Sequence, residues 1–316
     1  EYRRQRQMCI RDSHITIEDI PYTSIEFAKN NPVSLESGTS HKMQLVTGPA
    51  NATDHRIKWT SSNKTAATVD ENGTVTALRP IETVTITAVY KTNPALTCSW
   101  NLKITRTKGY ITKQMLDNLD LTAIKKVMIT AHPDDETLWG GGHLIEGEYL
   151  VVCMTHGWNP KRRTAFEQTM RTTNDKYLIL DYPDVRKTFS NGKYETDMLS
   201  TCKNAMQEDI NLILSYKKWD LIATHNPFGE YGKYLHKTIS QMVTQCYNKM
   251  TNKSATLYYF GRYYNSSNKI PGEQIAPELL AIKNSMVDRY YPTAKGAIVA
   301  FGHMIPYENW LLPSEW

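Results

Sequence analysis

The sequence lacks the main marks of a membrane-spanning or disulfide-stabilised protein. No stretch of its 316 residues is apolar enough to span a bilayer. Its five cysteines show no paired spacing, which argues against a zinc ribbon and against a disulfide framework. Its lysines are scattered and are not clustered with aromatic residues, so the net charge of +5 does not indicate a nucleic-acid partner.

The start of the chain also lacks apolar periodicity. Glu1–Ser13 carries four arginines, and no apolar core follows them, so this segment is not a signal peptide. We expect residues 1–19 to be a non-native or disordered leader that belongs to neither domain. If the leader is non-native, the lack of a signal peptide says nothing about export.

The chain is longer than the usual domain size of about 100–200 residues, so we expect more than one domain. The pattern of the sequence changes between Thr105 and Gly109, which indicates the domain boundary. Residues 20–107 consist of short alternating segments separated by polar turns, which predicts an all-β sandwich. Asn72-Gly73 predicts a hairpin with a type I′ turn, because both central positions of that turn need a positive φ. The strand candidates are His41–Val46, Ile57–Thr60, Ala67–Asp70, Thr74–Leu78 and Val84–Val89.

This segment resembles a bacterial Ig-like domain of group 2. The residues that carry the resemblance are Ile57–Asn63, Ala67–Ala77 and Val84–Ala88. We expect Trp59 to fill the sandwich core; the alternative is a platform on which a sugar stacks. The resemblance implies a spacer or adhesion unit, and therefore a secreted or cell-surface protein of a bacterium.

The most informative motif is the run Ala131–Glu136, which reads Ala-His-Pro-Asp-Asp-Glu. It follows Lys126–Thr130, a β-branched and apolar segment typical of a buried strand in a parallel sheet. Ligands bind at the carboxyl ends of such strands. His132 and Asp135 offer the nitrogen and oxygen donors that zinc takes in catalytic sites, and Asp134 could remove a proton from the bound water.

Each residue of this motif also has an ordinary structural interpretation. A single histidine near a strand end is commonly a hydrogen-bonded polar residue, and acids before a helix are commonly an N-cap cluster. Further polar clusters that follow other strand-like segments favour the metal site. They are Thr155–Asn159, Arg163–Glu167, Asp181–Asp184, His225–Asn226 and Gly229–His236. We expect His236, which opens a predicted helix, to be the third ligand.

Together, these motifs resemble the zinc-dependent N-acetylglucosaminyl deacetylases of the PIG-L or LmbE-like type, over residues 108–316. The resemblance implies a Rossmann-like three-layer α/β/α domain with a mostly parallel sheet. It also implies one zinc ion per active site, bound by His132, Asp135 and His236. Asp134 would be the general base that activates water for attack on the N-acetyl group.

The resemblance further implies that Tyr231 lies beside the substrate carbonyl and that Arg163 and Asp184 contact the substrate. Family members commonly carry Gly-His-x-x-His where this sequence reads Gly-Lys-Tyr-Leu-His. Lys233 therefore replaces a histidine that would polarise or protonate the intermediate, and an ammonium could still stabilise an oxyanion. His225 is a candidate stand-in that binds the substrate; its alternative role is a hydrogen-bonded histidine behind the metal ligands.

Three functions remain open at the level of sequence. The first is removal of the acetyl group from an N-acetylated sugar or glycoconjugate. The second is a catalytically idle module that keeps the metal and binds glycans or a surface partner, and the third is hydrolysis of another amide.

Gly140–Gly142 resembles a nucleotide-binding loop only superficially. Its glycines come several residues into a predicted helix, whereas those of the dinucleotide fingerprint lie in the preceding loop. We expect them to allow close packing of that helix against the sheet, or to mark its end.

Overall fold

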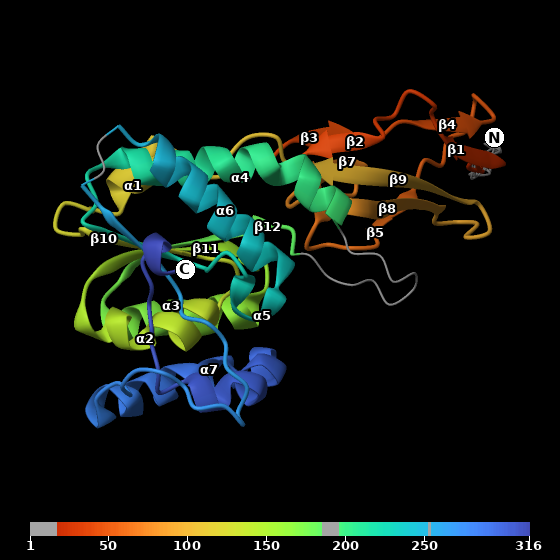
Figure 1. Ribbon diagram of the computed structural model, residues 1–316. Helices are drawn as coiled ribbons and strands as arrows, with labels where there is room; N and C mark the ends of the chain where they lie inside the picture. Colours follow the sequence, from red (N-terminus) through yellow and green to blue (C-terminus); the bar gives the residue numbers. More distant parts are fainter. Residues whose placement is uncertain (1–17, 185–195, 252–253) are drawn as a thin grey trace, which may run out of the picture.

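The computed structural model describes residues 18–184, 196–251 and 254–316, so the leader expected over residues 1–19 lies outside the described residues up to residue 17. Figure 1 shows a β-sandwich beside a larger α/β domain. The last strand of the sandwich ends at Thr105, and the first helix of the α/β domain begins at Lys113.

The sandwich is built from short, mostly antiparallel strands. One sheet has the order β2-β9-β8-β5, a second has the order β3-β7-β6, and β1 pairs with β4 alone. Alternate residues of each sheet fill the core between them, for example Val84, Ile86 and Leu102. The strands are β1 (Ser24–Phe27), β2 (Ser34–Glu36), β3 (Ser40–Lys42), β4 (Leu45–Gly48), β5 (Ile57–Ser61), β6 (Ala67–Val69), β7 (Thr74–Ala77), β8 (Ile81–Tyr90) and β9 (Thr97–Thr105).

Two details of the sandwich differ from the sequence predictions. The single strand expected over His41–Val46 is two strands that pair in different sheets, with the buried Met43 between them. The β6–β7 hairpin is present, but only Gly73 has a positive φ, so its turn is not type I′. The Asp70 carboxylate closes the turn instead, because it accepts hydrogen bonds from the backbone N–H groups of Asn72 and Thr74.

Trp59 packs as predicted against the sandwich core, with its ring centroid 5.9 Å from that of Phe27. The ring of Trp59 also limits the space available at Gly73. A Cβ at Gly73 would come within 2.6 Å of it, so the turn needs glycine for space as well as for its positive φ.

The α/β domain has a five-stranded, all-parallel sheet in the order β12-β11-β10-β13-β14. Its strands are largely buried on both faces, which accounts for their continuous apolar sequences. The elements are α1 (Lys113–Asn118), β10 (Lys126–Thr130), α2 (Asp135–Glu146), β11 (Tyr149–Thr155), α3 (Pro160–Thr173), β12 (Lys176–Tyr182), α4 (Thr196–Tyr216), β13 (Leu221–Thr224), α5 (Gly229–Gly232), α6 (Tyr234–Lys249), β14 (Thr256–Tyr259) and α7 (Pro277–Phe301), followed by 3-10 turns at Gly302–Met304 and Pro313–Glu315.

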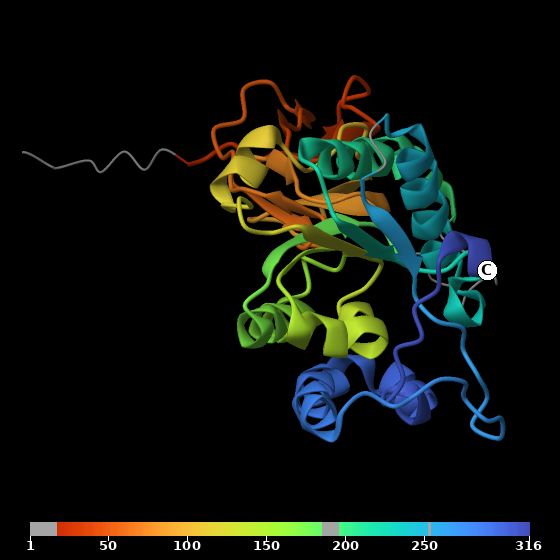
Figure 2. The same ribbon diagram turned by 60° about the vertical axis from the view of Figure 1, so that its left-hand side comes forward.

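Helices cover both faces of this sheet (Figures 1 and 2). Val127 and Ile129 of β10 face the core shared with α1, α4 and α6, whereas Met128 faces the core shared with α2, α3 and α7. Helix α7 lies outside α2 and α3 (Figure 1). The domain therefore has helices in layers on each side of one sheet, and the order of its strands reverses between β10 and β13, which is where ligands bind in open α/β sheets.

The three consecutive glycines lie inside α2 and allow close packing, as predicted. A Cβ at Gly140 would come within 2.7 Å of Met128 on the sheet, and one at Gly141 within 2.9 Å of Lys283 on α7. Lys283 is fully buried and pairs with Glu308 at 2.6 Å, and Glu308 also accepts a hydrogen bond from the backbone N–H of Gly142. This ion pair fixes α7 against α2.

Candidate metal centre

Three predicted ligands converge where β10 and β13 end. His132 lies in the loop after β10, Asp135 is the first residue of α2, and His236 lies in the first turn of α6. His132 Nδ1 lies 3.0 Å from His236 Nε2 and 3.2 Å from Asp135 Oδ2, and the last two atoms are 3.4 Å apart. All three side chains are buried. The three atoms can therefore bind one ion together.

The hydrogen bonds around these residues direct lone pairs toward the centre. Asp184 Oδ1 lies 2.9 Å from His132 Nε2, and Glu230 Oε2 contacts His236 Nδ1. Each carboxylate is satisfied by a proton on the imidazole nitrogen that it faces, which leaves the other nitrogen as an acceptor. In these tautomers three acceptor atoms meet at the centre, and either a proton or a metal ion completes them.

The electrostatics lead to the same conclusion. Burial opposes protonation of His132, but the carboxylates of Asp184 and Asp135 outweigh it and raise its pKa to about 10. The cluster therefore holds a positive charge, either as a proton or as a metal ion. Two imidazole nitrogens and one carboxylate oxygen form a donor set that suits zinc and leaves a position for water.

Glu230 holds two histidines of this centre in position. It is buried, and its Oε2 contacts Nδ1 of both His236 and His225. Although burial acts in the opposite direction, the two histidines lower the pKa of Glu230 to about 2. The sequence contained this residue in the run Gly229–His236 without marking it, because nothing local shows that its side chain turns back toward a helix that begins later.

His225 lies behind the metal ligands as a hydrogen-bonded histidine and does not lie where a substrate would bind. It is fully buried, its ring stacks on His236 at 3.9 Å between centroids, and its Nε2 accepts a hydrogen bond from the backbone N–H of Ala131 at 2.9 Å. It does not line the cavity at the metal centre. The prediction that His225 binds substrate is corrected accordingly, since both of its nitrogens are used inside the protein.

A cavity of about 90 Å³ opens in front of the three ligands. It contains the predicted Asp134, Tyr231, Lys233 and Asp184. Its complete lining is His132, Asp134, Asp135, Leu138, His156, Arg162, Asp184, Tyr231, Lys233, Ala297 and Phe301. Residues from well-separated segments of the chain therefore meet at one hollow.

Asp134 is positioned for chemistry and not for capping. It precedes α2 as the N-cap residue, yet its side chain makes no capping hydrogen bond, so the N-cap alternative does not hold for it. Burial, together with the neighbouring Asp135 carboxylate, raises the pKa of Asp134 to about 8. The carboxyl group faces the cavity beside the ligands and is free to exchange a proton there.

Strained backbone gathers at this site. Asp134, His156 and Glu230 have φ values of 139°, 66° and 53°, in the region that non-glycine residues rarely occupy. Such conformations cost on the order of 1–3 kcal/mol each and are concentrated at functional sites. His156, which the sequence placed only in a cluster that could line the cleft, does line it.

The structure places Arg162, and not the predicted Arg163, in the cavity lining. Arg163 Nε donates to the Gly157 carbonyl at 2.6 Å, and its guanidinium lies 3.8 Å from Glu167. Successive residues of a helix point about 100° apart, so neighbouring arginines of α3 serve different surfaces. The sequence alone could not show which arginine faces the cavity, because this depends on how α3 is oriented in the fold.

The sandwich touches the rim of this site. Arg79, just before β8, lies over the ring of Trp158 at 4.3 Å, and Trp158 follows His156 closely in the chain and stacks against its ring at 6.1 Å. The first domain therefore contacts the loop that supplies one wall of the cavity.

Comparisons with known proteins give two results. Residues 21–99 match the bacterial Ig-like domain (group 2), which confirms the resemblance of the sandwich. The chain is 31% identical over 175 residues to the uncharacterized protein L374 of Acanthamoeba polyphaga mimivirus, covering 50% of this chain and 67% of that protein. The chain belongs to the same family as L374.

Membership in this family assigns no activity. A second relative, the uncharacterized protein CA_P0160 of Clostridium acetobutylicum, is 32% identical over 117 residues, covering 37% of this chain and only 12% of that protein. The crystal structure of the conserved protein TT1542 from Thermus thermophilus aligns with 61% of this chain and 96% of its own, at 12% identity and a TM-score of 0.41. Within the described residues, the helices of this family member are all too short or too polar to cross a bilayer.

Proposed function

We propose that this protein is a zinc-dependent hydrolase that removes the N-acetyl group from an N-acetylglucosamine-type sugar or glycoconjugate. The observation that carries the proposal is the meeting of three lone pairs, from His132, Asp135 and His236, beside the uncapped Asp134. The parallel sheet and the position of the site where its strand order reverses support a Rossmann-like fold for this domain.

Zinc, when bound, supplies a Lewis acid that lowers the pKa of water to about 7. The protein contributes the rest. His132 and His236 present their lone pairs, and Asp184 and Glu230 hold the two rings in the required tautomers. A site arranged in this way does not need to reorganise when the substrate enters.

Asp134 is the general base. Its carboxylate takes a proton from the attacking water and later returns it to the departing amine, in line with its position in the cavity wall. Tyr231 of α5 and Lys233, which joins α5 to α6, offer an O–H and an ammonium to the oxygen that becomes negative during attack. Lys233 thus supplies a hydrogen-bond donor where the deacetylases that the sequence resembles carry a histidine.

The size of the cavity supports a small acyl group. At about 90 Å³ it is well below the roughly 300–1,000 Å³ of sites that enclose a whole small molecule. An acetyl group fits this space, and the sugar then remains at the rim. From the type of its Ig-like domain, we further propose that the protein is secreted or lies on the cell surface of a bacterium.

The deciding experiment is acetate release from N-acetylglucosamine oligomers with zinc present, compared between the native protein and Asp134→Asn. We expect the variant to keep its zinc and to lose about 10²- to 10⁴-fold in rate, which is the usual contribution of a general base. Asp175→Asn is the matched control, since Asp175 is a buried carboxylate of the same domain that does not line the cavity. Equal acetate release from native protein and Asp134→Asn would exclude the proposed enzyme.

A further inference from the structure

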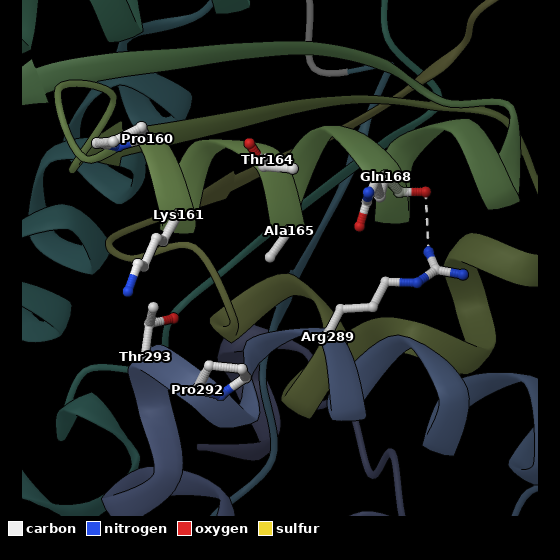
Figure 3. Close-up of a pocket in the computed structure, with 8 residues that line it drawn as sticks. All are labelled: Pro160, Lys161, Thr164, Ala165, Gln168, Arg289, Pro292 and Thr293. Atoms are coloured by element: carbon white, nitrogen blue, oxygen red, sulfur yellow. Dashed lines mark hydrogen bonds between the residues drawn. The ribbon is translucent and has the colours of Figure 1, made fainter.

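A second hollow lies between α3 and α7, next to the metal cavity. It has a volume of about 420 Å³. Figure 3 shows its two walls, with α3 above and α7 below. The lining residues are Pro160, Lys161, Thr164, Ala165, Gln168, Arg289, Pro292 and Thr293.

The same two helices, α3 and α7, contribute lining residues to both hollows. Ala297 and Phe301 of α7 line the metal cavity, and Arg289 and Thr293 line the groove. The backbone of α7 is kinked at Ala294, between the two pairs. On α3, Lys161 of the groove and Arg162 of the cavity are consecutive, and their side chains leave the helix about 100° apart.

Arg162 joins the two helices. Its Nη2 donates to the Thr293 carbonyl at 3.2 Å, while its side chain lines the metal cavity. A substrate whose acetyl group enters the small cavity must place its remaining atoms outside it. Among the described residues, the groove is a neighbouring hollow with room for them.

The chemistry of the groove selects for negative charge. Two of its eight lining residues, Lys161 and Arg289, are cations, and none is acidic. Arg289 is held in place because its Nη1 donates to the Gln168 carbonyl and to Thr172 Oγ1, both at 2.8 Å. Lys161 extends from α3 toward α7 (Figure 3), and Thr164, Thr293 and Gln168 add groups that hydrogen-bond hydroxyls.

We propose that this groove binds the saccharide unit next to the N-acetylated sugar, and that this unit carries an anionic group such as a carboxylate. The inference rests on the proposed deacetylase function and narrows its substrate class to acidic oligosaccharides. Lys161 and Arg289 bind the carboxylate, since charge-assisted hydrogen bonds from such cations are the strong ones. The neutral hydroxyls of the same unit contact Thr164 and Thr293.

The test measures binding apart from turnover. Zinc-loaded Asp134→Asn protein is titrated in a calorimeter with a hyaluronan tetrasaccharide, in which uronate alternates with N-acetylglucosamine, and with chitotetraose, which is neutral. In this background, Lys161→Ala combined with Arg289→Ala is expected to weaken hyaluronan binding about three- to thirtyfold and to leave chitotetraose binding unchanged. Lys64→Ala with Lys91→Ala, on the exposed surface of the sandwich, is the control with the same change in net charge.

Two further measurements keep the result unambiguous. Lys161→Glu alone should weaken hyaluronan binding more than Lys161→Ala, and added salt should weaken the binding of hyaluronan and not that of chitotetraose. Equal affinity of the native groove for both saccharides, or equal losses in the groove and control pairs, would overturn the proposal even if acetate is released. Charge-dependent hyaluronan binding without any acetate release would instead retain the groove and reject the deacetylase.

Discussion

Each domain of this protein buries a carboxylate among polar partners, and the two clusters differ in the balance of donors and acceptors. In the sandwich, Asp54 Oδ1 accepts from Arg56 Nε at 2.7 Å, and its Oδ2 accepts from Tyr90 Oη at 2.8 Å and from Thr92 Oγ1 at 2.5 Å. Every partner is a donor. The cluster is complete as it stands and joins β8 to the loop before β5.

In the α/β domain, Asp135 Oδ2 accepts from the backbone N–H of His132 at 2.7 Å, but it also faces ring nitrogens of His132 and His236 at 3.2 and 3.4 Å. Asp184 and Glu230 accept hydrogen bonds from the outward-facing nitrogens of these two rings, which leaves the inward-facing nitrogens as acceptors. Buried charge therefore does not by itself mark a functional site. An excess of buried acceptors is a better indication of a cation site, because unpaired buried acceptors are costly unless a proton or a metal ion completes them.

The largest expected effect comes from removing a ligand. His236→Ala should lose stoichiometric zinc and all measurable acetate release, a greater loss than the roughly 10- to 100-fold that follows removal of a supporting carboxylate. Metal analysis of the purified protein and the acetate assay measure the two effects. His41→Ala in the sandwich should keep full zinc content, and retention of zinc by His236→Ala would contradict the assigned ligand set.

A somewhat smaller effect is expected at Lys233, the cation in the cavity wall. Unlike Arg56, which is bound to Asp54, Lys233 is available to a developing oxyanion. Lys233→Ala should lower kcat about 10²- to 10³-fold, the usual loss for one oxyanion donor, with zinc content unchanged. Lys233→His should restore part of the rate, and wild-type kcat in Lys233→Ala would remove this residue from the mechanism.

Glu230→Gln is expected to weaken zinc binding without removing a ligand. The amide no longer balances the protons on His225 and His236, so zinc affinity should fall about 10- to 100-fold. Competition with a fluorescent chelator gives the dissociation constant. An unchanged constant would mean that Glu230 only supports the fold.

The complementary change is Tyr90→Phe in the balanced cluster. Losing one hydrogen bond to the Asp54 carboxylate should lower the free energy of unfolding by about 1.5–3 kcal/mol. Zinc affinity and acetate release should not change, since this cluster needs no cation. Chemical denaturation, with zinc binding measured in parallel, tests both statements.

The smallest effect concerns Asp175, whose pKa burial raises to about 7. An acid whose folded pKa is raised stabilises the fold below its unfolded pKa of about 4 and loses this contribution as the pH rises to about 7. Compared with Asp175→Asn, the native protein should therefore lose stability across this window, at up to about 1.4 kcal/mol per pH unit. Parallel profiles of unfolding free energy against pH for the two proteins would contradict the assignment.

Local sequence was sufficient for much of the architecture and for part of the site. Lys126–Thr130 is a strand because its apolar residues fit a sheet buried on both faces, and Ala131–Glu136 turns into a helix directly after it. His132 and Asp135 are three residues apart, so the loop alone brings their side chains together. The strand candidates of the sandwich failed only at His41–Val46, where the chain moves between sheets, a choice that alternation does not encode.

Tertiary structure decided the rest. Whether Arg162 or Arg163 faces the cavity depends on the rotation of α3, and the burial of His225 behind His236 depends on packing between β13 and α6. The ring proton of His132 is placed by Asp184, which lies far from it in sequence. The sequence by itself determined which groups could bind a metal, because donor chemistry belongs to the residue. The fold determined which lone pairs meet, because direction in space is set by contacts between distant segments.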